Sequence, residues 1–183
     1  QTPPHGPRGV TGATGGVGAL AVDIFSQAGF EVHAVSGKAD QAAFLRELGA
    51  SEVLPREALP TTRRMESARF GGGLDNAGGP MLASLLAQTV PYGNVVSAGL
   101  AASPALDMTV MPFIIRGVSL LGVSSSSAPR ELREQVWHRL GNEWKPRHLA
   151  AICTREITLD GLPDVFEGML AGHSLGRTVV RID

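Results

Sequence analysis

The chain has 183 residues, of which 43% are hydrophobic and 18% charged, and its formal net charge is −1 at pH 7. This length favours one domain with a short appendage, and the composition excludes a disordered chain or a coiled coil. The near-neutral charge gives no reason to expect nucleic acid or a membrane surface as a partner. No apolar run is long enough to span a bilayer and no signal peptide is recognisable, so we expect a cytoplasmic protein.

Short apolar strands alternate with amphipathic helices from residue 9 to about residue 122, a pattern typical of a parallel α/β sheet covered by helices on both faces. The predicted strands are 9–11, 31–36, 52–54, 74–77, 94–98 and 118–123. The predicted helices are 16–28, a helix capped by Asp40 that ends at Gly49, and 81–88. In the first helix we expect one buried stripe, made of Val17, Leu20, Ala21, Ile24, Phe25 and Ala28.

The two ends of the chain differ from this regular middle. Residues 1–8 are rich in Pro and Gly, and we interpret them as a truncated or disordered start that precedes a domain at 9–127. Residues 128–183 are predicted to form a helix over 129–144, a strand over 156–159, a helix over 162–170 and a strand over 177–182. This helix–strand segment is expected to complete or flank the same domain.

A glycine-rich turn, Thr11 to Gly18, joins the first predicted strand to the first helix. Gly12 permits a tight turn, Gly15 lets the backbone approach a pyrophosphate, and Gly18 lets the helix lie close to the sheet. The free N–H groups at the start of the helix can then bind phosphates. The position of the turn predicts a doubly wound Rossmann domain that binds a dinucleotide. A glycine turn that serves packing alone remains the alternative.

The end of the second strand indicates which dinucleotide is bound. NAD sites usually carry an acid there, but this chain has Ser36, Gly37 and Lys38. A hydroxyl, an open N–H and a cation suit the 2′-phosphate of NADP(H), and Arg56 can add charge from the next loop. An ordinary solvated lysine and a surface arginine are the alternative interpretation.

Several other classes of protein are disfavoured by single residues. Short-chain dehydrogenases need a Tyr followed four residues later by a Lys, whereas the only tyrosine, Tyr92, is followed there by Val96. The five histidines show no metal-binding spacing, and Cys153 is the only cysteine. We therefore expect no metal site and no intrachain disulfide.

Several separated segments resemble a known family in order along the chain. The Gly12–Gly18 turn and the segments 48–50 and 95–99 resemble the medium-chain dehydrogenase/reductases. Segments 35–38, 53–56, 110–114 and 176–180 resemble its quinone-oxidoreductase-like branch, which includes NADPH-dependent acryloyl-CoA reductases.

The resemblance implies roles for individual residues. Residues 14–17 would contact the pyrophosphate, and residues 36–38 would contact the 2′-phosphate. Leu100 and Ile115 would flank the nicotinamide half, and Arg177 would reach the cofactor from the last strand. Core packing is the alternative for the first two and a surface charge for the third. The expected cofactor-binding set is Gly12, Thr14, Gly15, Gly16, Val17, Gly18, Ser36, Gly37, Lys38, Arg56, Asn76, Leu100, Ile115, Ser125 and Arg177.

Members of this family carry a catalytic domain, a GroES-like partial barrel, before the nucleotide-binding domain, and their substrate pocket lies between the two. This chain resembles the nucleotide-binding half and the C-terminal return segment. One hypothesis is therefore the NADPH-binding domain of an oxidoreductase that reduces an activated alkene, with a small-molecule substrate only if a catalytic domain is supplied. The other is a stand-alone NADP(H)-binding or sensing module without turnover. A strand that lacks its partner domain also predicts a homo-oligomer.

Overall fold

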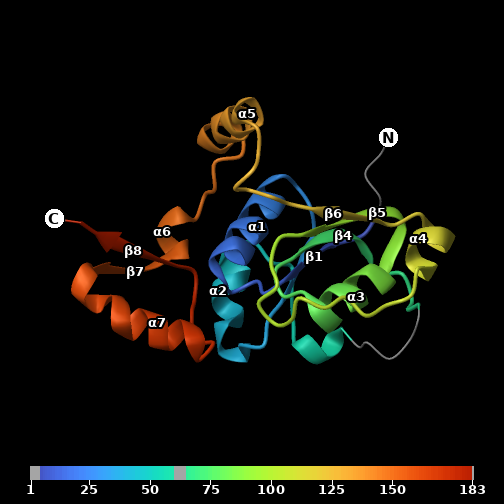
Figure 1. The fold of residues 1–183 in the computed structure, drawn as a ribbon, viewed down its shortest axis with the longest axis horizontal. Helices are drawn as coiled ribbons and strands as arrows, with labels where there is room; N and C mark the ends of the chain where they lie inside the picture. The colour runs from blue at the N-terminus through green and yellow to red at the C-terminus, as the bar shows by residue number, and fades with distance from the viewer. Residues whose placement is uncertain (1–4, 60–64, 183) are drawn as a thin grey trace.

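The computed structural model describes residues 5–59 and 65–182, and these form two units (Figure 1). The larger unit is a six-stranded parallel sheet within the described residues, with strand order β3-β2-β1-β4-β5-β6. The chain winds outward in one direction from β1 to β3 and in the other from β4 to β6. The predicted doubly wound α/β fold is confirmed.

The elements of this unit follow the predicted alternation of strands and helices. The strands are β1 (Arg8–Thr11), β2 (Val32–Val35), β3 (Glu52–Leu54), β4 (Phe70–Asp75), β5 (Thr89–Ser97) and β6 (Ser119–Gly122). The helices are α1 (Gly16–Gln27), α2 (Ala42–Glu47), α3 (Gly79–Ala87) and α4 (Met111–Arg116). The short helix α4 lies in a stretch for which the sequence predicted no element.

Two apolar clusters cover the two faces of the sheet. One contains Val32 and Ala34 of β2 and is covered by α1 and α2. The other contains Val35 of the same strand and is covered by α3, which lies on the opposite side in Figure 1. Alternate residues of a strand point to opposite faces, so β2 supplies side chains to both clusters.

The buried face of α1 differs from the predicted stripe. The helix buries Gly18, Ala19, Val22 and Asp23, whereas Val17 is 46% exposed. Leu20, Ala21 and Phe25 are only partly buried at the margin of the cluster. The prediction was wrong for two reasons. The small Gly18 and Ala19 let the helix lie close against the sheet. Hydrogen bonds to the carboxylate of Asp23 reduce the free-energy cost of burying this acid.

Strand β4 begins at Phe70, four residues before the predicted start at Leu74. Three consecutive glycines, which are poor strand formers, hid its beginning. A Cβ on Gly73 would lie 2.2 Å from the carbonyl oxygen of Gly9 in the adjacent strand. The glycine is therefore required by the close approach of two backbones. Strand β5 likewise begins at Thr89 rather than at Asn94.

The helix ends show one correction and two agreements. Asp40 does not cap α2, because it lies in a preceding turn of 3₁₀ helix and its carboxylate accepts a hydrogen bond from Gln41 Nε2 at 2.7 Å. Gln41 occupies the N-cap position instead. Gly29 and Gly49 follow the C-cap residues of α1 and α2 and have φ values of 84° and 100°, as expected for glycines that end helices.

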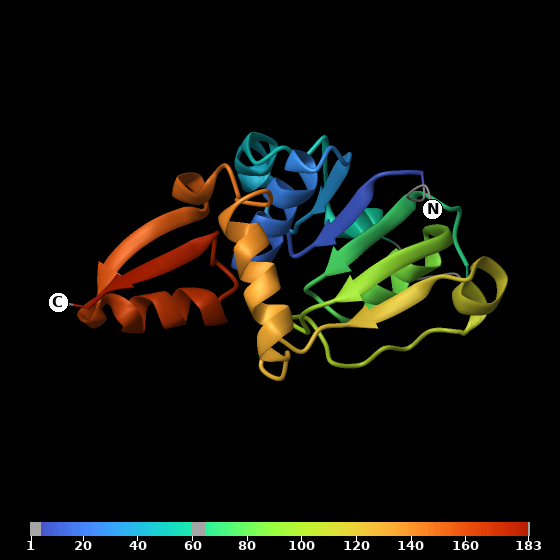
Figure 2. The same cartoon turned by 90° about the horizontal axis from the view of Figure 1, so that it is seen from above.

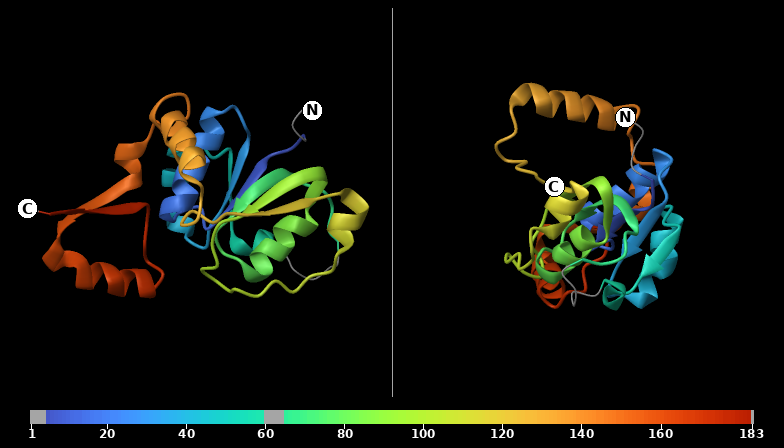
Figure 3. Two further views of the ribbon diagram at one scale, coloured as in Figure 1. Left: turned by 45° about the horizontal axis from the view of Figure 1, so that its top comes forward. Right: turned by 90° about the vertical axis from the view of Figure 1, so that its right-hand side faces the viewer.

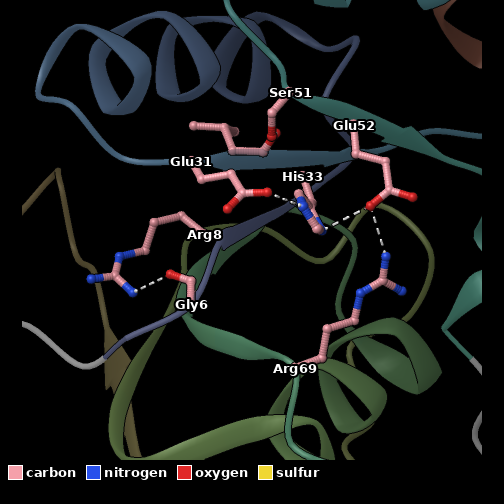
Figure 4. Close-up of polar contacts among 8 residues, drawn as sticks. Gly6, Arg8, Glu31, His33, Ser51, Glu52 and Arg69 are labelled. Carbon is pink, nitrogen blue, oxygen red and sulfur yellow. Dashed lines mark hydrogen bonds and ion pairs between the residues drawn. The ribbon is translucent and has the colours of Figure 1, made fainter.

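Charged residues gather near the amino-terminal ends of the strands β1 to β4 (Figure 4). The buried His33 of β2 lies 3.0 Å from Glu31 and 3.3 Å from Glu52, and Arg69 pairs with Glu52 at 3.0 Å. Arg8 belongs to β1, and Pro7 accepts a hydrogen bond from Gly71 N. The disorder predicted for residues 1–8 therefore does not extend to Pro7 and Arg8, while residues 1–4 lie outside the described part of the chain.

The smaller unit follows β6 and lies beside α1 and α2 (Figure 2). Its elements are α5 (Arg130–Gly141), α6 (Leu149–Ile152), β7 (Cys153–Thr158), α7 (Leu162–Leu170) and β8 (Arg177–Arg181). Strands β7 and β8 form a separate two-stranded parallel sheet. Helix α5 buries none of its residues and projects from the body of the molecule (Figure 3). Helix α6 was not predicted, and β7 begins three residues before the predicted strand.

Candidate dinucleotide-binding site

A cleft of about 600 Å³ opens at the carboxyl ends of the central strands. It lies where the strand order reverses between β1 and β4, the place at which doubly wound sheets bind their ligands. The loops that follow β1, β2, β4 and β5 line most of it.

The glycine-rich turn forms the floor of the cleft. Gly12 has a φ of 58°, and Gly15 N donates a hydrogen bond to Gly12 O at 3.0 Å, which closes the turn. A Cβ on Gly18 would lie 2.3 Å from Gly12 O, so α1 can start this close to the turn only with glycine there. Gly15 occupies the N-cap position of α1 and provides no capping side chain, which leaves the first N–H groups facing the cleft.

A pair of basic side chains marks one end of the cleft, beside the end of β2. Lys38 N donates to the buried Ser36 Oγ at 3.0 Å. The guanidinium of Arg56 lies over Gly37, since a Cβ there would be 2.6 Å from Arg56 Nε. Partial burial lowers the pKa of Lys38, Arg56 acts in the same direction, and Asp40 opposes the shift. The end of the cleft is therefore a compact cationic site, and its lining includes no acid among the residues that the structure describes.

The C-terminal segment closes the cleft from the side. Gly176 N donates to Thr14 O at 2.8 Å, and Lys38 Nζ donates to the carbonyl oxygen of Ser174. The side chain of Arg177 lies against Gly16, where a Cβ would be 2.4 Å from Arg177 Nε. Residues more than 130 positions away in sequence thus lie directly against the glycine-rich turn and the end of β2.

The other end of the cleft is formed by the loops after β4 and β5. Asn76 and Ala77 lie on one side, and residues 98–102, including the 65% exposed Leu100, lie on the other. Ala101 N and Ala102 N donate to the carbonyl oxygens of Asn76 and Ala77 at 3.3 and 2.8 Å. The two loops therefore form one continuous wall.

Most of the predicted cofactor-binding residues line this single cleft. The lining residues among them are Gly12, Thr14, Gly15, Gly16, Val17, Gly18, Ser36, Gly37, Lys38, Arg56, Asn76 and Leu100. Arg177 lies beside the lining, against Gly16. Ile115 is 60% exposed on α4, and the carbonyl of Ser125 accepts a hydrogen bond from Arg133, both apart from the lining. A role in binding remains a prediction for all of these residues.

Sequence reasoning missed the part of the lining that comes from the C-terminal segment. Met169, Leu170, Gly172 and Ser174 all contribute to the cleft. No local pattern distinguishes these residues from an ordinary helix end and loop, because only the fold of the chain brings them to the turn.

The described residues contain no group of three or more His, Cys, Asp or Glu side chains placed to hold a metal ion. Across residues 5–59 and 65–182, no helix is long and apolar enough to cross a membrane.

The chain matches one known family over most of its length. Residues 16–142 match the family model described as zinc-binding dehydrogenase. This chain belongs to that family. The name of the family implies zinc, but the part of the chain that is described offers no set of ligands for it.

Individual relatives confirm the predicted resemblance to oxidoreductases of this kind. Acrylyl-CoA reductase AcuI of Ruegeria pomeroyi is 40% identical over 184 residues, which cover 100% of this chain and 56% of the relative. The structure of Escherichia coli K-12 YhdH with bound NADPH is 40% identical, with a TM-score of 0.94, and the match covers 99% of this chain and 56% of YhdH. The structure of Bacillus subtilis YhfP with NAD bound is 38% identical, with a TM-score of 0.93, and the match covers 100% of this chain and 56% of YhfP. The chain thus spans little more than half the length of these relatives.

Proposed function

We propose that this chain is the NADP(H)-binding domain of an oxidoreductase that reduces an activated alkene, such as an acryloyl thioester, an enone or a quinone. The observation that carries the proposal is the cationic end of the cleft, where Lys38 and Arg56 surround the Ser36–Gly37 turn and no acid takes the place expected in an NAD site. The relatives crystallised with NADPH or NAD, and the acrylyl-CoA reductase at 40% identity, support it.

Each part of the cleft has a task in this proposal. The N–H groups at the start of α1 bind the pyrophosphate, with Arg177 as a nearby cation. Ser36, Lys38 and Arg56 bind the 2′-phosphate through charge-assisted hydrogen bonds. The wall of Asn76 and Leu100 receives the nicotinamide half and keeps water from one side of it. The bound cofactor would supply hydride to the β-carbon of the alkene.

Reduction of such an alkene also needs a donor that stabilises the negative charge developing on the carbonyl oxygen. The lining of the cleft contains no His, Tyr, Cys, Asp or Glu among its described residues. This composition favours the second candidate for the chain by itself, a binding or sensing module without turnover. Oxidation of NADPH by this chain with acryloyl-CoA or a simple quinone would reject the second candidate.

Titration of NADPH and NADH by calorimetry tests the assignment of the phosphate end. A hydrogen bond to a charged group contributes about 1.5–3 kcal/mol, which is roughly 10- to 150-fold in affinity, and solvent exposure favours the lower end for Lys38. Lys38→Ala should therefore weaken NADPH about tenfold more than NADH, because the lost contact with Ser174 O affects both cofactors whereas the lost charge affects only NADPH. Lys145→Ala removes the other lysine, which is exposed beyond α5, and should change neither affinity. Equal weakening of both cofactors by Lys38→Ala would contradict the assignment.

Two further variants separate binding from folding. Ser36→Asp should reverse the preference toward NADH, because a carboxylate repels the phosphate but accepts hydrogen bonds from ribose hydroxyls. Gly15→Val should abolish binding of both cofactors and preserve the helix content. The nearest atom that a Cβ on Gly15 would meet is Gly12 O at 3.3 Å, so the intrusion falls mainly on the cleft. Unchanged affinity in Gly15→Val would remove the glycine turn from the site.

A further inference from the structure

Asp75 is a wholly buried acid at the end of β4, immediately below the cleft, and it has no cationic partner among its described contacts. One carboxylate oxygen accepts a hydrogen bond from Thr11 Oγ1 at 2.6 Å. The other accepts one from Gly78 N at 2.7 Å. The side chain therefore joins the end of β1 to the loop that follows β4.

The same hydrogen bonds fix the backbone that forms the wall of the cleft. Thr11 Oγ1, which donates to Asp75, accepts a hydrogen bond from Asn76 N at 3.0 Å. Asn76 Nδ2 donates to Thr11 O at 2.9 Å. With Asn76 and Gly78 held, the carbonyl oxygens of Asn76 and Ala77 point at the loop after β5 and accept its N–H groups.

Only a group with two acceptor oxygens satisfies this arrangement. Both partners of Asp75 present a hydrogen: Gly78 N can only donate, and the Thr11 hydroxyl directs its single hydrogen at the carboxylate while it accepts from Asn76 N. In Asp75→Asn, an NH₂ group turned toward Gly78 N meets a donor, and one turned toward Thr11 leaves the hydroxyl hydrogen without its acceptor. A buried donor without an acceptor is costly, so the loop must move to find one.

We propose that Asp75 is a positioning residue for the nicotinamide half of the dinucleotide, an inference that rests on the proposed function. In a doubly wound site the adenosine half lies over β2 and the pyrophosphate lies over the turn. The nicotinamide half then lies over the ends of β4 and β5, which is the wall that Asp75 holds. The residue does not line the cleft, and it acts through Asn76 and Gly78.

The test compares two probes, NADPH and adenosine 2′,5′-bisphosphate, the second of which lacks the nicotinamide half. Calorimetry should show that Asp75→Asn weakens NADPH at least about fivefold and leaves the bisphosphate within about twofold. Thr11→Val, an isosteric change that breaks the same network, should give the same split. Thr89→Val is the matched control and should change neither affinity. Thr89 is equally buried, lies at the end of β5 away from the cleft, and donates a hydrogen bond to Leu85 O of α3.

Every outcome bears on the proposal. Equal weakening of both probes, or unchanged NADPH binding in Asp75→Asn, would overturn it. If Asp75→Asn does not fold, Thr11→Val decides by the same comparison. If the wild-type chain binds neither probe, the proposed function fails and this inference fails with it. If the wild type binds both probes, the proposed function stands and the variants test the role of Asp75 alone.

Discussion

The six-stranded unit and the C-terminal segment contribute to the same cleft but are held in the molecule by different means. Among the described residues, the buried apolar side chains are almost all before residue 119, and only Ile152 and Val165 belong to the C-terminal segment. The segment is attached to α1 through Ile152, which joins the apolar cluster under α1, and through a buried polar contact. Asp23, which is 1% exposed, accepts hydrogen bonds from His148 N and His148 Nδ1 at 2.9 and 3.0 Å.

The difference shows that a cofactor site can depend on a part of the chain that contributes little to the core. The sheet determines where the glycine turn lies, because each strand end is fixed by burial on both faces. The C-terminal loop is held by two hydrogen bonds: Gly176 N donates to Thr14 O in the turn, and the Lys38 side chain after β2 donates to Ser174 O. Stability and binding are therefore expected to respond differently to changes in the two units.

The largest expected effect contrasts two leucines on helices of the two units. Leu85 of α3 is fully buried, and Leu85→Ala should lower the free energy of unfolding by about 2–5 kcal/mol. Leu170 of α7 is 90% exposed, and Leu170→Ala should change it by less than about 0.5 kcal/mol. Denaturation in urea measures both. Similar losses in the two variants would show that the C-terminal segment has a core of its own.

An intermediate effect is expected where the two units join. Asp23→Asn places the NH₂ group of an amide against one of two donors, His148 N and His148 Nδ1. The substitution should destabilise the attachment of the C-terminal segment to α1 by about 1–3 kcal/mol. Hydrogen exchange should quicken in β8, and NADPH should bind less tightly because Ser174 and Gly176 lose their support. Glu156→Gln, which removes an exposed ion pair with Arg181, is the control and should change stability by less than about 1 kcal/mol. Unchanged exchange in Asp23→Asn would assign the attachment to Ile152 alone.

The open edges of the smaller sheet predict self-association. A two-stranded sheet leaves one edge of each strand unpaired, and β8 carries Val179 and precedes Ile182, which are 47% and 80% exposed. We expect a dimer or larger oligomer in light scattering, and we expect Val179→Lys to shift it toward monomer. Val110→Lys alters an exposed valine next to α4 and should leave the state unchanged. A monodisperse wild-type monomer at high concentration would contradict this prediction.

The smallest effect concerns pH and the phosphate end. Because burial lowers the pKa of Lys38, the side chain loses its charge at a lower pH than an exposed lysine does. NADPH binding needs the protonated form, so the preference for NADPH over NADH should decrease as the pH rises from neutral toward the ordinary pKa of lysine. The stability of the fold changes in the opposite direction: the contribution of Lys38 to the free energy of unfolding should increase as pH rises. The folded chain releases this proton at a lower pH than the unfolded chain does. Lys38→Arg should remove the pH dependence of the preference. A preference that is flat with pH in the wild type would exclude Lys38 as its source.

Local patterns in the sequence were sufficient where one element carries the whole signal. The helix over 162–170 and the strand over 52–54 were predicted with the bounds observed, and the glycine turn lies between a strand and a helix as expected. Prediction failed where a neighbour decides the outcome. The start of β4 depends on the backbone of Gly9, and the buried face of α1 depends on the partner of Asp23.

The sequence by itself determined the class of the sheet, through the alternation of strands and helices, and it determined the glycine turn and Lys38, through the residues that directly follow β1 and β2. Only the tertiary structure brought Ser174 and Gly176 onto that turn and tied Asp75 to Thr11 and Gly78. Apart from the local contact of Asp75 with Gly78, these contacts join residues more than sixty positions apart. Such contacts leave no periodic pattern in a single sequence, because the packing of strands and helices sets the distance between donor and acceptor.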